Sequence, residues 1–140
     1  MGLFSWSDAY SLEHPQIDTE HRALFALANE LHEAMRNGSG SLVLKDLLSR
    51  LINYTRVHFA HEESLMRHYQ YPAMNPHVAE HRKLTEQVLE LQQKFEAGKL
   101  TITMETMHFL RNWLERHILQ SDQLVARHIR TEDGELARVS

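Results

Sequence analysis

The most constraining feature of the sequence is a set of polar side chains at positions where a helix normally buries leucine. Residues 58–81 read HFAHEESLMRHYQYPAMNPHVAEH and contain five histidines. Residues four apart lie one turn apart on the same face of an α-helix. His58 and Glu62 form one such pair, and His77 and His81 form another. Both pairs lie in the apolar stripe of a predicted helix, so the fold has to bury imidazoles together with a carboxylate.

Four segments of the chain have apolar residues at helical spacing, and turn-forming residues separate them. The predicted helices cover approximately residues 17–36, 41–70, 76–97 and 103–130. Asp18 or Thr19 is the expected N-cap of the first helix, and the stretch NGSG at 37–40 ends it. In the third helix, Asn75 is the expected N-cap and Pro76 the first helical residue. The pattern predicts helices only.

Short connections between consecutive helices make neighbouring helices antiparallel. The sequence therefore predicts an all-α fold, an antiparallel up-down-up-down four-helix bundle, as a single domain over residues 1–140. Residues 1–16 form an irregular N-terminal arm, which we expect to pack on the bundle because Phe4, Trp6 and Tyr10 are apolar. Residues 131–140 are expected to be a frayed tail. The expected inner face of the fourth helix consists of Thr106, Leu110, Trp113 or Leu114, His117 and Leu124.

Composition excludes several classes of function. The formal charge of −4 provides no basic field for nucleic acid or an anionic membrane, and no apolar run is long enough to insert into a bilayer. Cysteine is absent, which excludes disulfides, thiolate metal sites and cysteine nucleophiles. The N-terminal segment MGLFSWSDAY lacks a basic region and a continuous apolar run, so we expect a cytoplasmic protein without a secretory signal.

Seven polar groups fall on the inner faces of the four predicted helices. They are His21, His58, Glu62, His77, His81, His117 and Asp122. In an antiparallel bundle the start of one helix lies beside the end of the next, so all seven fall in one layer. Burying an unpaired carboxylate costs several kcal/mol, and bound cations offset that cost. Asp122 is the least secure member of the set. It follows His117 by five residues, which on an ideal helix rotates its side chain by about 140° from that of His117. To reach the same centre, Asp122 needs a position on the helix flank or a local bulge in the helix.

The donor types narrow the choice of metal. Imidazole nitrogen and carboxylate oxygen without sulfur suit iron, manganese, zinc or copper. Seven donors exceed the needs of one ion but suit two ions that share bridging carboxylates. The HExxH motif of zinc proteases is absent, and the ferritin-like pattern of two ExxH motifs is not met, since only Glu105 and His108 form one. A histidine-rich, carboxylate-poor site favours reversible binding over oxygen activation.

The segments IDTEH (17–21), HFAHEESLM (58–66), HVAEH (77–81) and WLERHILQSD (113–122) resemble the hemerythrins, specifically the single-domain bacterial members of that family. The resemblance implies a four-helix bundle with a non-haem di-iron centre: two iron ions joined by an oxo or hydroxo bridge. It implies that His77, His81 and His117 hold one iron, that His21 and His58 hold the other, and that Glu62 and Asp122 bridge them. It further implies that dioxygen binds at an open position on the second iron.

Residues near these expected ligands are predicted to wall a pocket, to cap a helix, to pack in the core or to lie at the surface. Phe25, Tyr54 and Leu114 each lie one turn from a ligand and are expected to wall a mostly apolar pocket at the open position. Asp18 and Glu63 are expected to be an N-cap and a solvated surface charge rather than partners of ligand histidines, and Met66 is expected to pack. The histidines expected at the surface are His14, His32, His61, His68, His108 and His128.

Three functions are compatible with this site. The first is reversible binding of dioxygen for carriage, storage or delivery. The second is a sensor of dioxygen, nitric oxide or redox state that acts through a separate partner protein. The third is an enzyme or repair protein acting on peroxide or nitric oxide, for which the pocket offers only Tyr54 as a general acid. We therefore predict a dioxygen-binding protein rather than an enzyme, with the protein partner unknown.

Overall fold

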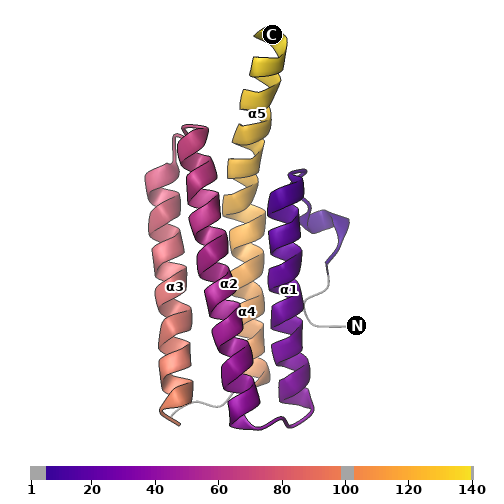
Figure 1. The fold of residues 1–140 in the computed structure, drawn as a ribbon, viewed down its shortest axis with the longest axis vertical. Coiled ribbons are helices and arrows are strands. Elements are labelled where there is room, and N and C mark those ends of the chain that lie inside the picture. Colours follow the sequence, from indigo (N-terminus) through magenta and orange to yellow (C-terminus); the bar gives the residue numbers. More distant parts are fainter. Residues whose placement is uncertain (1–5, 99–102, 140) are drawn as a thin grey trace.

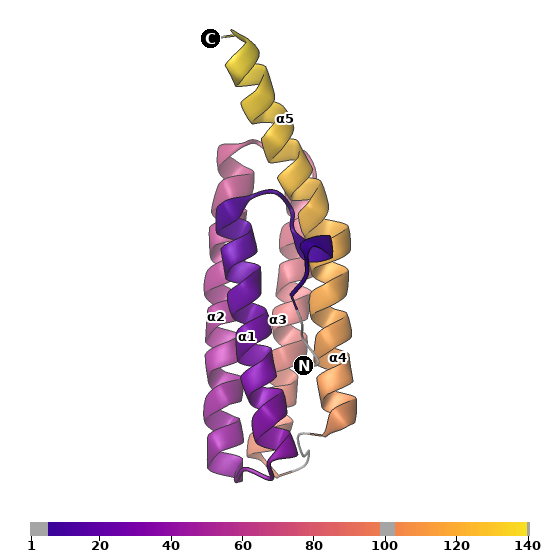
Figure 2. The ribbon, with the colours of Figure 1, turned by 90° about the vertical axis from the view of Figure 1, so that its right-hand side faces the viewer.

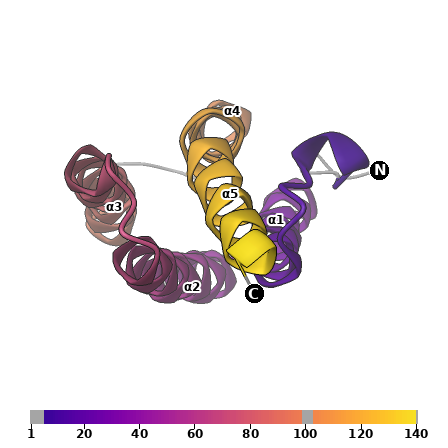
Figure 3. The same ribbon diagram turned by 90° about the horizontal axis from the view of Figure 1, so that it is seen from above.

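The architecture is an all-α, antiparallel four-helix bundle, as the sequence predicted (Figure 1). The computed structural model describes residues 6–98 and 103–139. The elements are η1 (Asp8–Tyr10), α1 (Pro15–Arg36), α2 (Ser41–His68), α3 (Met74–Glu96), α4 (Met104–Arg116), η2 (His117–Asp122) and α5 (Gln123–Val139). Viewed from above, α1, α2, α3 and the α4–α5 rod surround one interior (Figure 3). The fourth helix of the bundle is thus α4, η2 and α5 in succession, and η2 is a π-helical segment.

The first helix begins earlier than predicted. Pro15 is its first residue, and the His14 side chain caps it by accepting a hydrogen bond from the backbone N–H of Ile17 at 3.2 Å. The expected N-cap at Asp18 or Thr19 is therefore wrong, because proline at the first position already fixes a helical φ and leaves no unpaired N–H. Gly38, with φ of 69°, follows the C-terminal end, a left-handed conformation that glycine adopts without steric cost.

The third helix also begins earlier than predicted. Met74 is its first residue and Ala73 its N-cap, so Asn75 is not the cap and Pro76 is the third helical residue. Proline is tolerated there because the N–H groups of the first turn have no partner within the helix. His77 is consequently in the first turn of α3, close to the end of α2.

The apolar stripes of the helices meet in one main core. Its buried residues include Leu24, Phe25, Leu31, Leu48, Leu51, Phe59, Val88, Leu110, Trp113 and Leu114. On α5, however, Leu124 is 52% exposed, whereas Val125, Ala126 and Ile129 are buried. The prediction for Leu124 is wrong because the π-helical turn of η2 adds one residue and moves the inner face from position 124 to 125.

The N-terminal arm packs against α1 and α4 (Figure 2). The rings of Trp6 and Tyr10 contact Phe25, with centroids 5.7 Å and 5.0 Å away, and the Tyr10 hydroxyl donates to Glu115 at 2.7 Å. Asp18 is buried and accepts hydrogen bonds from Ser11 Oγ at 2.7 Å and from the backbone N–H at position 12 at 2.9 Å. Asp18 therefore fastens the arm to α1. The expected packing of Phe4 lies outside the described residues.

The C-terminal segment differs from the frayed tail that the sequence predicted. α5 continues to Val139 and extends beyond the ends of its neighbours (Figures 1 and 2). The segment 131–139 contains glutamate, leucine, alanine and arginine, which are good helix formers, so the helix propagates past the bundle. Among the described residues, no helix is both long enough and apolar enough to cross a membrane.

Candidate metal centre

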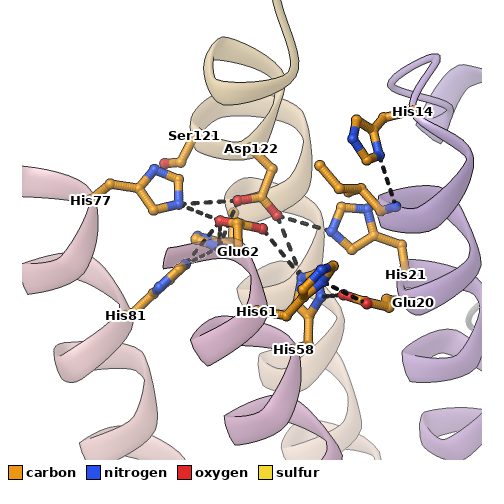
Figure 4. Close-up of polar contacts among 12 residues, drawn as sticks. His14, Glu20, His21, His58, His61, Glu62, His77, His81, Ser121 and Asp122 are labelled. Carbon is orange, nitrogen blue, oxygen red and sulfur yellow. Dashed lines mark hydrogen bonds and ion pairs between the residues drawn. The ribbon is translucent and has the colours of Figure 1, made fainter. Parts of the chain in front are cut away.

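All seven residues predicted from the sequence converge in one buried layer of the bundle. Figure 4 labels six of them, all except His117. The seven residues come from every helix of the bundle: His21 from α1, His58 and Glu62 from α2, His77 and His81 from α3, and His117 and Asp122 from η2. Each of these seven residues is 4% exposed or less. Helices of opposite direction place these positions at one height, so the layer follows from the fold.

The donor atoms form two groups that share two carboxylates. One group contains Glu62, His77, His81, His117 and Asp122, and the other contains His21, His58, Glu62 and Asp122. Within each group the donor atoms lie within 4.8 Å of one another. Two metal positions with common bridging carboxylates account for this arrangement, and one position has five protein donors whereas the other has four.

The π-helical segment explains how Asp122 reaches the centre. A π-helix closes its hydrogen bonds over five residues instead of four, so residues five apart lie on one face. η2 begins at His117 and ends at Asp122, and both side chains point inward. Asp122 Oδ2 lies 2.9 Å from Nε2 of His21 on the opposite side of the layer. Of the two arrangements expected to bring Asp122 to the layer, a flank position or a local bulge, the structure has the bulge.

Three glutamates outside the seven candidate ligands face the outer nitrogens of three of the candidate histidines. The contacts join Glu20 to Nδ1 of His58 at 2.6 Å, Glu63 to Nδ1 of His81 at 2.9 Å, and Glu80 to Nδ1 of His117 at 2.9 Å. The prediction that Glu63 is a solvated surface charge is therefore wrong, because its helix brings it against α3. Glu20 and Glu80 were missed, although each directly precedes a ligand histidine in the sequence. Such carboxylates fix the tautomer and orientation of a ligand imidazole.

The arrangement of the inner atoms fits cations. A carboxylate opposite Nδ1 makes that nitrogen the donor, which leaves the lone pair of a neutral ring on Nε2. Nε2 of His81 and Nε2 of His117 are 3.0 Å apart. Oε2 of Glu62 and Oδ1 of Asp122 are buried and have no hydrogen-bond partner among the described residues. Lone pairs and anionic oxygens at this spacing repel one another unless positive charge lies between them.

In the metal-free chain, protons supply that positive charge. Burial disfavours the charged form of His58, but the hydrogen bond to Glu20 and the negative charges of Glu62 and Asp122 outweigh burial and raise the pKa of His58 to about 9. Burial likewise opposes protonation of His77, but the neighbouring carboxylates of Asp122 and Glu62 outweigh burial and raise the pKa of His77 to about 9. Metal and protons therefore compete for the same nitrogens.

This competition predicts proton release on metal binding. At pH 7 both His58 and His77 carry a proton in the metal-free protein, because pH 7 lies below their pKa of about 9. Since a metal binds neutral imidazole, loading at pH 7 should release at least two protons per chain, one from each ring. Indicator absorbance in weakly buffered solution during anaerobic titration with Fe²⁺ measures this release. Release should decline as the starting pH rises through about 9, and a titration at pH 7 without proton release would contradict the assignment.

Comparison with known proteins gives the family of the chain. The family model of the hemerythrin HHE cation binding domain matches residues 14–139. The chain belongs to the hemerythrin family. A bacteriohemerythrin of Methylococcus capsulatus is 35% identical over 125 residues, which cover 89% of this chain and 95% of that protein. A bacteriohemerythrin of Stenotrophomonas maltophilia is 31% identical over 138 residues, covering 99% of this chain and 89% of that protein.

Solved hemerythrin structures have the same fold. A wild-type hemerythrin superposes with a TM-score of 0.84 at 32% identity, covering 89% of this chain and 96% of that one. A leucine-to-alanine variant of hemerythrin gives a TM-score of 0.86 at 32% identity, with coverage of 91% and 98%. Hemerythrin domains hold a non-haem di-iron site, and the donor set of this chain fits that cofactor in type, in number and in its two shared carboxylates.

The three residues expected to wall the hemerythrin ligand pocket occupy different environments. Phe25 and Leu114 are 3% and 4% exposed and belong to the main core. Tyr54 is half-buried and lines an open groove between α1 and α2, together with Leu27 and Val57. A wall at the open metal position stays a prediction for all three, and Tyr54 also faces outward. Met66 packs with Val125 and Ile129 in a smaller core cluster.

The remaining histidines are mostly at or near the surface, with one exception. His68 and His108 are exposed, whereas His14, His61 and His128 are partly buried and hydrogen-bonded or ion-paired. His32 was predicted at the surface but is only 5% exposed, because its position continues the inner stripe of α1. Neither of its ring nitrogens has a hydrogen-bond partner among the described residues.

Proposed function

We propose that this hemerythrin-family chain binds dioxygen reversibly at its di-iron centre and serves in carriage, storage or delivery in the cytoplasm. The unequal donor sets carry this proposal. Five protein donors surround one metal position and four surround the other, so the second position has room for a small external ligand. When bound, the iron pair supplies the electrons that hold dioxygen.

The protein supports this function in two ways: it buries the metal positions away from solvent, and it supplies mostly uncharged imidazole donors. His21 and His58 at the four-donor position are 0% and 1% exposed, and apolar side chains of the main core surround the layer. A dry environment disfavours the loss of charged oxygen species to water, which supports release of dioxygen instead of irreversible oxidation. Five imidazoles and only two carboxylates also place little negative charge on the metals, which disfavours high oxidation states.

The test is a cycle of oxygenation on purified protein. We expect two irons per chain after anaerobic reconstitution with Fe²⁺, and a visible charge-transfer band that appears in air and disappears under argon through repeated cycles. The metal-free chain, carried through the same cycles, is the matched control. Immediate conversion to a stable oxidised spectrum would contradict reversible binding, and one iron or none per chain would contradict the di-iron assignment.

Two other uses of the same centre remain alternatives. A sensor of dioxygen, nitric oxide or redox state would require a separate partner that binds only one state of the protein. An enzyme acting on peroxide or nitric oxide would require turnover, and loss of that turnover in a Tyr54→Phe protein would favour it. Tyr54 is half-buried beside a surface groove, so it can exchange protons with solvent, but its burial and the nearby Glu20 raise its pKa.

A further inference from the structure

The glutamates that contact ligand histidines follow a regular pattern along the bundle. Each one lies on the helix before the ligand that it supports: α1 supports a ligand on α2, α2 supports one on α3, and α3 supports one on η2. This pattern leaves out the ligand on the first helix, and His77 on α3 likewise has carboxylate contacts through Nε2 alone among the described residues. Nδ1 of His21 is fully buried and has no hydrogen-bond partner among the described residues. His21 is therefore held only by packing and by its contact with Asp122.

The two metal positions receive this support unequally. At the five-donor position, His81 and His117 both donate from Nδ1 to a glutamate. At the four-donor position, His58 alone does so. A hydrogen bond at Nδ1 fixes the rotation of the ring and keeps Nε2 aimed at the metal. A ring without that bond can turn away from the metal at a lower cost.

The glutamates themselves are also held unequally. Glu80 accepts from Ser121 Oγ at 2.8 Å and 2.6 Å in addition to His117, so α3 and η2 are joined at two points. Glu20 divides its two oxygens between His58, at 2.6 Å, and Nδ1 of His61, at 2.8 Å (Figure 4). His61 is 29% exposed. The acceptor at the four-donor position is thus shared with a side chain that solvent reaches.

We infer that Glu20, Glu63 and Glu80 are positioning residues for the metal ligands, and that their unequal distribution makes metal exchange sequential. The metal at the four-donor position, held by His21 and His58, leaves first and enters last. The metal at the five-donor position has one more protein donor and two supported imidazoles, so it leaves second. This inference rests on the di-metal centre proposed above and is independent of what the centre binds.

The experiment measures metal loss from protein loaded with two Co²⁺ ions per chain. After an excess of chelator is added anaerobically, visible absorbance should decay in two phases, each corresponding to one Co²⁺. Glu20→Gln should accelerate the fast phase by about 10–100-fold and leave the slow phase unchanged. Glu80→Gln should accelerate the slow phase by a similar factor. Glutamine preserves the shape of the side chain and removes its charge, which weakens the hydrogen bond from Nδ1.

Glu86→Gln is the matched control. Glu86 is an exposed residue of α3, and it forms no ion pair or hydrogen bond within the described part of the chain, so its substitution removes the same charge without touching a ligand. Both phases should equal those of the wild type. A single phase in the wild type, equal effects of Glu20→Gln and Glu80→Gln on one phase, or an equal effect of Glu86→Gln would each overturn the inference.

A second measurement needs no variant. With one equivalent of Zn²⁺ per metal-free chain, the imidazole nitrogen resonances of His77, His81 and His117 should shift while those of His21 stay unchanged. The opposite order would overturn the inference. Neither measurement uses dioxygen, so a failure here would leave reversible oxygenation standing, and a failure of the oxygenation cycles would leave the exchange order standing.

Discussion

Replacing Glu62 by alanine is expected to abolish the binding of two metals by one chain. Glu62 is 1% exposed and belongs to both donor groups, so its loss removes one candidate ligand from each proposed metal position at once. It also leaves Nε2 of His58 and Nε2 of His77 without the oxygens that lie 3.3 Å and 2.6 Å from them. We expect at most one iron per chain by metal analysis, and no visible band that responds to air.

The control for this substitution is Glu86→Ala, which removes an exposed carboxylate from the neighbouring helix. It should retain two irons per chain and the full band. Circular dichroism of both proteins separates loss of metal from loss of the fold. A folded Glu62→Ala protein that still holds two irons would show that Asp122 alone suffices as a bridge, and the assignment of Glu62 would then be wrong.

The fold and the ligand layer were predictable because both depend on regular spacing. Apolar residues at steps of three and four define each helix, and short connections make neighbours antiparallel. Once that topology is assumed, the depth of a residue in its helix gives its height in the bundle. His21 early in α1 and His58 late in α2 must then lie at one height, as the structure places them. This prediction of a common height needs only the order and direction of the helices, and no side-chain contacts.

The features that the sequence did not reveal depend on contacts between helices or on local departures from the α-helix. Glu63 has the composition and position of a surface charge, and only the packing of α2 on α3 brings it to His81. The cap of α1 was misplaced because histidine is an uncommon capping residue and Asp18 a common one. Asp18 instead accepts from the arm, a contact that depends on the path of residues without helical periodicity.

The π-helical turn was anticipated only as one of two options for Asp122, and the inner face predicted for the helix after it was wrong. A regular helix after His117 would place Leu124 inside, whereas the added residue in η2 places Val125 there. The spacing of five between His117 and Asp122 was the only sign of it in the sequence. In this chain the π-helical turn therefore corresponds to a pair of inward donors five residues apart, followed by an apolar stripe displaced by one residue.

Deleting Gln120 from η2 is expected to preserve the binding of two metals, an unusual outcome for a deletion inside a helix. Gln120 is exposed, and its removal converts the π-helical turn into an ordinary α-helical turn with Asp122 four residues after His117. Residues four apart share a face of an α-helix, so the carboxylate still points at the centre. The inner face of α5 also keeps its direction, because the extra residue of the π-helical turn is what moves the buried position from 124 to 125.

Deleting Asn112 from α4 is the matched comparison. Asn112 is also exposed, but it lies in regular α-helix, where each residue contributes about 100° of rotation. Its removal turns His117 and Asp122 away from the layer or turns Leu110 out of the core. We expect this protein to bind no metal pair and to unfold at a lower temperature, by metal analysis and circular dichroism. If the protein lacking Gln120 lost its metals as completely as the protein lacking Asn112, the π-helical geometry itself would be required for binding. Directing the side chains of His117 and Asp122 toward the centre would then be insufficient.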